Sequence, residues 1–119
     1  MAGIEMTLEP GRSVCGSTTG RPLVAAMDLL GRRWSLRILW ELRADPLGAR
    51  ELLTRCDRLS SSVLYDRLRE LTGALLVEQT DASAYRLTSL GQSVGLALEP
   101  LDAWSKTWDR ATRQRSAVS

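Results

Sequence analysis

The sequence predicts a mainly α-helical protein with one small β-hairpin, an α+β fold. Apolar residues recur at helical spacing in short segments between residues 22 and 72, and Gly or Pro residues separate several of them. Two short β-compatible stretches follow at 75–80 and 83–88, and a longer amphipathic segment runs from about Leu90 toward Arg113. This order is that of a winged helix-turn-helix with one extra helix at each end.

The chain has 119 residues, which suits one domain with a single core. Hydrophobic residues make up 44% and charged residues 25%, values that are typical of a folded globular protein. Residues 1–20 are interrupted by Gly and Pro among Ser and Thr, which favours a flexible arm. We therefore expect an N-terminal arm over 1–20, a winged helix-turn-helix domain over 21–113 and a C-terminal tail over 114–119.

Several classes of function are disfavoured by composition. The chain has no histidine, the usual general base and the commonest metal ligand, and its two cysteines, Cys15 and Cys56, form no CxxC pair. We expect no metal, no cofactor and no enzymatic activity. Without a signal peptide or a membrane-length apolar run, we also expect a cytoplasmic protein with no membrane partner.

The first half of the domain reads as a series of short helices. Pro22 suits the start of a helix that carries a stripe of Leu23, Met27 and Leu30 and ends at Gly31. A second helix is expected within Trp34 to Leu42, and a third over Ala49 to Cys56, after a turn at Asp45 to Gly48. The positions expected to face the core in these two helices are Ile38, Leu39, Leu42, Leu52, Leu53 and Cys56.

The segment from Ser60 to Thr72 is the most informative stretch. Its leucines, Leu64, Leu68 and Leu71, share one helical face, and the opposite face is short, polar and partly basic. Ser60 is a candidate N-cap, and Thr72 with Gly73 is a plausible end of the helix. A turn of only three residues joins this helix to Ala49–Cys56, as in a helix-turn-helix with its recognition helix. The alternative is an ordinary helical pair within a core.

A hairpin and a terminal helix complete the domain. Leu75, Leu76 and Val77 are expected to bury against the helices, and Tyr85 and Leu87 to share one side of the returning strand. The turn at Asp81-Ala82 lacks the glycine that tight hairpin loops prefer. Thr88 or Ser89 should cap the last helix, and Pro100 should kink or break it. Leu96, Leu101, Trp104 and Trp108 lie along this helix.

Basic residues are concentrated in the helical half. Between Arg12 and Arg69 there are 11 arginines against 6 acidic residues, an excess of five positive charges, and Lys106 is the only lysine. Guanidinium groups bind phosphate or guanine in a forked geometry, although an arginine bias can also reflect genome composition. The candidate DNA contacts are Ser60, Ser61, Ser62, Tyr65, Asp66, Arg67 and Arg69 on the recognition helix, with Arg32, Arg33, Arg50 and Arg86 around it. The alternative for each is a solvated surface side chain.

The chain resembles a known family, the HxlR-type winged helix-turn-helix transcriptional regulators of bacteria, in the MarR-like superfamily. The residues that carry the resemblance are Met27 to Leu42, Glu51-Leu52, Leu59-Ser60, Leu64 to Leu71, Leu76 to Glu78, Tyr85 to Gly91, and Trp104. They span roughly residues 22 to 108 in the family's order. The resemblance implies a homodimer built on the N-terminal and C-terminal helices, which binds double-stranded DNA through two recognition helices in successive major grooves of a pseudo-palindromic site. It also implies a repressor or activator whose DNA affinity responds to an electrophile, an oxidant or a small molecule.

The chain departs from the family pattern at several positions. Arg21 stands where many members have a sensor cysteine before the first helix, and Cys15 lies six residues earlier. Gly48-Ala49 replaces a usual Arg-Phe pair, and Leu75 replaces a usual glycine. The wing, Glu78 to Tyr85, contains no Arg or Lys, which leaves Arg86 as the nearest cation for a minor-groove contact.

Two further sets of residues are candidates for regulation. A dimer pocket lined by Trp34, Trp40, Trp104 and Trp108 could bind an aromatic effector, although these residues fit packing or a dimer seam equally well. Cys15 is the candidate reactive thiol, and Cys56 is expected to be a buried small hydrophobe.

The leading interpretation is a dimeric DNA-binding regulator. A second is a winged-helix protein-interaction module without DNA binding, which the uncharged wing and Asp66 favour. A thiol enzyme is disfavoured because the chain lacks histidine as a base.

Overall fold

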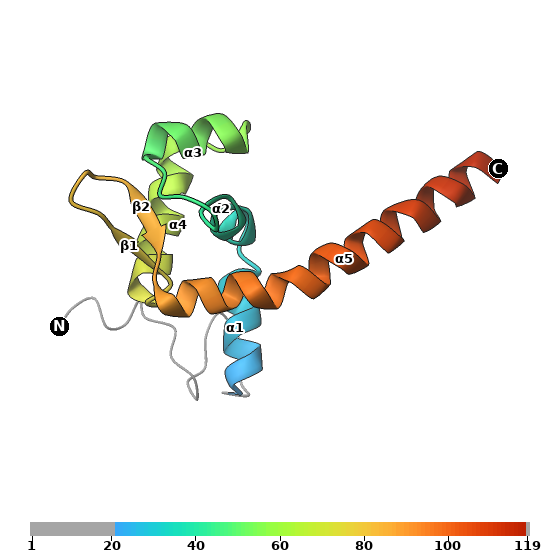
Figure 1. Cartoon of the computed structure of the whole chain (residues 1–119), viewed down its shortest axis with the longest axis horizontal. Coiled ribbons are helices and arrows are strands. Elements are labelled where there is room, and N and C mark those ends of the chain that lie inside the picture. Colours follow the sequence, from blue (N-terminus) through green and yellow to red (C-terminus); the bar gives the residue numbers. More distant parts are fainter. Residues whose placement is uncertain (1–20, 119) are drawn as a thin grey trace.

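A computed structural model describes residues 21–118, and the expected arm over 1–20, with Cys15, lies outside them. The elements in chain order are α1 (Pro22–Leu30), α2 (Ser35–Glu41), α3 (Ala49–Cys56), α4 (Ser61–Gly73), β1 (Val77–Gln79), β2 (Tyr85–Leu87) and α5 (Ser89–Val118). Figure 1 shows α2, α3, α4 and the hairpin gathered at one end, while α5 passes beneath them and continues far beyond the body. The predicted α+β winged helix-turn-helix is confirmed.

The helices start and stop for local reasons. Pro22 opens α1, where its missing N–H is not needed, and Gly31 ends it. A Cβ at Gly31 would lie 2.6 Å from the carbonyl oxygen of Met27, so the close approach of the chain requires glycine there. Ser60 caps α4 as predicted, because its hydroxyl accepts a hydrogen bond from the Val63 amide at 3.3 Å.

One core of aliphatic side chains lies between the helices and the hairpin. Every predicted inward position of α2 and α3 is buried or packed against this core, and the leucines of α4 are at most 2% exposed. The largest fully buried side chains are Ile38, Leu39, Leu52, Leu64, Leu68, Leu71 and Val77. The stripe on α1 behaves differently, because Leu23 and Met27 are 68% and 62% exposed.

The hairpin is shorter than expected and is tied to the helices. β1 and β2 pair antiparallel, with Val77 opposite Leu87 and Gln79 opposite Tyr85. Leu47, just before α3, exchanges two backbone hydrogen bonds with Tyr85, at 3.0 and 2.8 Å, so the hairpin is fixed against the helix-turn-helix. In the turn, Ser83 adopts a φ of 62°, a conformation that glycine usually supplies.

The prediction that Leu75 is buried is wrong. Leu75 is 68% exposed, whereas Leu76 is 5% and Val77 is 1% exposed. The cause is the reversal of the chain after α4, where the Leu75 amide donates to Thr72 and the Leu76 amide to Leu71, both at 3.0 Å. This turn places Leu75 at a φ of 68° and points its side chain outward, so that the next two residues enter the core.

The terminal helix is longer and less interrupted than the sequence suggested. α5 runs without a break through Pro100 and continues to Val118, past the expected end at Arg113 and through most of the expected tail. Figure 1 shows its two halves running in different directions, which fits the predicted kink at proline. No helix within residues 21–118 is both long and apolar enough to cross a membrane.

Candidate nucleic-acid interface

The two faces of α4 separate as the sequence predicted. Leu64, Leu68 and Leu71 are buried, and the opposite face is exposed along its length. The exposed candidates on this helix are Ser61, Ser62, Tyr65, Asp66 and Arg69. Ser60 is also exposed, but its hydroxyl is engaged as the cap of the helix and lies 3.4 Å from that of Ser62. Ser61 and Ser62 are therefore the hydroxyls at this end that remain outside the capping bond.

A neighbouring carboxylate partly neutralises the positive charge of Arg69. Its guanidinium donates to the Asp66 carboxylate at 3.1 Å, and the two side chains are 69% and 54% exposed. An exposed pair of this kind contributes little to stability, so the guanidinium can leave it at small cost. A stronger acceptor, such as a phosphate oxygen, would compete well for Arg69.

The structure places Arg67 and Arg32 in an internal ion-pair cluster. One Arg67 nitrogen lies 2.9 Å from both carboxylate oxygens of Glu70, and another donates to the Arg33 carbonyl at 2.9 Å. Arg32 reaches the same carboxylate at 3.2 Å from the turn between α1 and α2. Arg67 and Glu70 are only 18% and 16% exposed. This placement favours a role in fixing α4 over the direct DNA contact expected for these two arginines.

Glu70 was missed by the sequence analysis. Its pairing with Arg67 at i and i+3 was visible as a helical spacing. The contact with Arg32 spans 38 positions of the chain and depends on how the helices pack. No local sequence signal could have revealed it.

The remaining candidate arginines, Arg33, Arg50 and Arg86, are exposed. Arg33 lies 5.8 Å from the Trp34 ring, and Arg50 is exposed in the first turn of α3. Arg86 pairs with Glu78 across the hairpin at 2.8 Å, so the base of the wing is close to neutral. Arg58 was not among the candidates, yet it is exposed in the turn that leads into α4 and has no acidic partner among residues 21–118. Its position two residues before the Ser60 cap was the available signal.

A second cluster fixes α3 against α2. Arg37 donates to the Glu41 carboxylate at 2.8 Å and to the carbonyl oxygen of Arg55 at 2.7 Å, and Arg55 lies 3.5 Å from Glu41. The Arg55 carbonyl lies near the C-terminal end of α3, where backbone acceptors lack helical donors. Both helices that flank the turn are thus anchored by side chains outside the turn.

Cys56 is a buried free thiol at the end of α3, 1% exposed, as expected. Its burial raises the pKa of the thiol, an effect that Arg37 opposes and Glu41 reinforces. Because the thiolate is the reactive form, Cys56 is a poor nucleophile in the folded protein.

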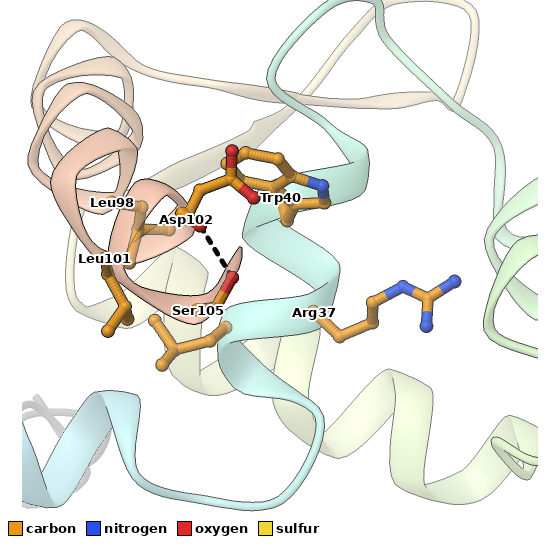
Figure 2. Close-up of a pocket in the computed structure, with 7 residues that line it drawn as sticks. Arg37, Trp40, Leu98, Leu101, Asp102 and Ser105 are labelled. Carbon is orange, nitrogen blue, oxygen red and sulfur yellow. Dashed lines mark hydrogen bonds between the residues drawn. The ribbon is translucent and has the colours of Figure 1, made fainter. Parts of the chain in front are cut away.

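The four tryptophans occupy different places in the described monomer, and a dimer pocket lined by all four stays a prediction. Trp40 lines a pocket of about 250 Å³ between α2 and α5, together with Leu98, Leu101 and Asp102. Figure 2 shows these side chains around the opening, with Arg37 extending away from it and the Ser105 hydroxyl donating to the Asp102 carbonyl. Trp34 packs against the core instead. Trp104 and Trp108 stack farther along α5, with ring centroids 5.8 Å apart.

Large apolar side chains are exposed along both terminal helices. Trp104 and Trp108 are each 57% exposed, and Leu96 is 66% exposed. The others on these helices are Leu23, Met27, Leu90 and Leu101. A series of this size on elements that project from the core is typical of an interaction surface.

Comparison with known proteins agrees with this architecture. A model of the HxlR-like helix-turn-helix family matches residues 29–113. The HTH-type transcriptional regulator YodB of Bacillus subtilis is 28% identical over 96 residues, which cover 76% of this chain and 86% of YodB. The crystal structure of quinone-bound YodB superposes with a TM-score of 0.68 at 26% identity, covering 79% of this chain and 99% of that one.

Two other solved structures share the fold. A possible HxlR family transcriptional factor from Thermoplasma volcanium has a TM-score of 0.65 at 26% identity, covering 71% of this chain and 82% of that one. A regulator of the MarR family from Enterococcus faecalis, at 24% identity, has a TM-score of 0.68 over 87% of this chain and 99% of that one. The family match over residues 29–113 shows that the chain belongs to the HxlR-like helix-turn-helix family of transcriptional regulators.

Proposed function

We propose that the protein is a sequence-specific DNA-binding regulator that acts as a homodimer on a pseudo-palindromic operator. The observation that carries the proposal is the outer face of α4, a continuous polar surface over a buried leucine face. Side chains on such a helix reach base edges when the helix lies in the major groove. Ser61, Ser62 and Tyr65 are the proposed base-reading residues.

Phosphate contacts are assigned to cations around the helix. Arg50 and Arg58 lie at the start of α3 and just before α4, and neither has an acidic partner among the described residues. Arg33 and Arg86 stay as weaker candidates, because each already has a neighbour, an indole ring and a carboxylate respectively. Arg32 and Arg67 are proposed to orient α4 through Glu70 rather than to touch DNA.

The proposed dimer uses the exposed apolar side chains of α1 and α5. The radius of gyration is 16.2 Å, against about 13 Å for a compact domain of about 100 residues. The outer half of α5 projects away from the body and causes much of this extension (Figure 1). The stacked Trp104 and Trp108 belong to this helix. A second copy that covers this face would bring two α4 helices into one assembly, as a two-fold symmetric operator requires.

Selection of bound duplexes from a random pool tests the proposal. We expect enriched sequences with two inverted half-sites whose centres lie about 34 Å apart or a multiple of that distance. Binding should weaken steeply with salt, because the protein displaces counterions from several phosphates. No enrichment, combined with no duplex binding at low salt, would reject a DNA-binding function.

Regulation by a small molecule or a thiol-reactive compound is part of the proposal. A quinone-bound structure exists for the Bacillus subtilis relative, and in this chain Cys15 is the proposed reactive thiol because Cys56 is buried. Treatment with benzoquinone should lower operator affinity, and Cys15→Ser should abolish the response while Cys56→Ser preserves it. An equal response in the Cys15→Ser variant would remove the thiol from the proposal.

The alternative is a winged-helix module that binds a protein partner. The observation that favours it is the wing, where Glu78 and Arg86 neutralise each other and the turn carries Asp81 but no cation. Affinity capture from nuclease-treated lysate separates the two functions. Stoichiometric recovery of one protein partner, together with no duplex selection, would favour the module.

A further inference from the structure

We propose that the groove between α4 and the hairpin is a seat for one phosphate of the operator backbone, shared by the recognition helix and the wing. This inference rests on the DNA-binding function proposed above. It assigns a DNA contact to Thr72, Gln79 and Tyr85, none of which was a candidate DNA contact from the sequence. The proposal also gives the uncharged wing a role in DNA binding that does not require a cation at the tip of the wing.

The groove has a volume of about 290 Å³ and is built from two elements. The helix contributes Tyr65, Arg69 and Thr72, which lie at i, i+4 and i+7 and so follow one line along α4. The hairpin contributes Gln79 and Tyr85, which are directly opposite each other in the strand register. Leu68, 2% exposed, lies beneath them.

Every polar side chain that lines this groove can donate a hydrogen bond, and Arg69 can only donate. Arg69 is the one charged side chain among the described residues that line it, and its present partner Asp66 does not line it. The side chains of Tyr65, Thr72, Gln79 and Tyr85 make no hydrogen bond within the described chain. One cation and several unused hydroxyl and amide donors fit an oxyanion with several acceptor oxygens, such as a phosphodiester.

The geometry of a helix beside a wing explains why a backbone phosphate would reach this groove. One sugar-phosphate strand always separates the major groove from the neighbouring minor groove. When α4 lies in the major groove, the hairpin beside it faces the other side of that strand, and the strand crosses the space between the two elements. That space is the groove described here.

This assignment gives the two ends of α4 different roles in DNA binding. Ser61 and Ser62, at the first turn, are left to read bases, whereas Arg69 and Thr72, near the last turns, hold the backbone. Phosphate contacts fix the register of a protein on its duplex, and base contacts then discriminate sequence. Loss of the seat should therefore weaken binding to every operator variant by a similar factor.

The test uses the full chain and its selected operator, with single methylphosphonate substitutions scanned through one half-site. The variants are Gln79→Met and Tyr85→Phe, which remove the donors and keep the size of each side chain, and Arg69→Gln. Gln92→Met, at an exposed glutamine of α5, is the matched control. Circular dichroism and sedimentation verify that each variant folds and assembles as the wild type does.

On unmodified operator, Gln79→Met and Tyr85→Phe should each weaken binding by roughly tenfold, since each removes a hydrogen bond to a charged group. Arg69→Gln should weaken it by more, and Gln92→Met should leave it unchanged. One methylphosphonate position should weaken wild-type binding and abolish the difference between wild type and both hairpin variants. That same position should abolish the effect of Arg69→Gln, because helix and wing share one phosphate.

Unchanged affinity of both hairpin variants would overturn the phosphate seat while leaving DNA binding intact. Losses that persist at every methylphosphonate position would also overturn it, because the affected contact would not be to a phosphate. Failure of the wild type to bind any duplex would overturn the proposed function and the seat together.

Discussion

Leu75 has a backbone conformation that is unfavourable for a residue with a side chain. Its φ of 68° lies in the left-handed region, which costs a residue with a Cβ about 1 to 2 kcal/mol relative to glycine. Packing of the Leu75 side chain offsets little of this cost, because the side chain is 68% exposed. The position ends α4 and starts the path to β1, so the strain is imposed by the connection between helix and hairpin.

Replacing Leu75 by glycine should therefore stabilise the protein. We expect Leu75→Gly to raise the free energy of unfolding by about 0.5 to 1 kcal/mol, the relief of strain being partly offset by the greater freedom of glycine in the unfolded chain. Urea denaturation followed by circular dichroism measures this change. Ala97→Gly, at an exposed helical position of α5, should lower stability by about 1 kcal/mol and is the control. A loss of stability in Leu75→Gly would show that its exposed side chain makes contacts that the monomer lacks.

At the scale of the elements, local sequence patterns were sufficient for the helices and insufficient for the site. The Pro22 start, the Ser60 cap and the leucine spacing of α4 are properties of a few neighbouring residues, and all three were predicted correctly. Leu75 is exposed because the chain reverses after α4 through a left-handed conformation that a leucine does not indicate. The Arg32–Glu70 ion pair depends instead on how distant segments meet. The groove between α4 and the hairpin has the same origin, since Tyr65 and Gln79 come together only after the hairpin packs.

The orientation of α4 depends on Glu70, and this can be tested. Glu70→Gln leaves Arg67 and Arg32 without their carboxylate and should lower stability by about 1 kcal/mol, a modest value because these side chains are partly exposed. Removing an acidic group beside DNA should by itself strengthen binding. If Glu70 positions the recognition helix, operator affinity should instead fall by about three- to tenfold.

Two measurements separate these effects. Glu99→Gln, at an exposed acid of α5, is the charge-matched control and should leave affinity unchanged or slightly higher. The slope of log affinity against log salt should be the same in Glu70→Gln and wild type, because no phosphate-binding cation is removed. Tighter binding by Glu70→Gln would contradict the positioning role.

At the scale of the whole molecule, the length of α5 and its exposed indoles are not explained by a monomer. The chain extends 57 Å along its longest axis, and the exposed indoles of Trp104 and Trp108 stack at 6° to each other on the projecting half of α5. These two large, exposed aromatic residues represent apolar area that gains stability only against another surface. A second copy is the partner that the symmetry of a palindromic operator would require.

A charge at this face should therefore prevent dimerisation without unfolding the monomer. Trp108→Glu changes a side chain that is 57% exposed in the monomer, so the helix-turn-helix should keep its stability while the proposed dimer dissociates. Sedimentation should report a monomer, and operator affinity should fall by at least tenfold because one half-site alone is bound. The salt dependence should weaken as well, since one subunit neutralises about half as many phosphates.

Lys106→Glu introduces the same side chain on the opposite side of α5 and should remain dimeric. A Trp108→Glu protein that still sediments as a dimer would place the interface elsewhere, with the exposed residues of α1 as the next surface to test.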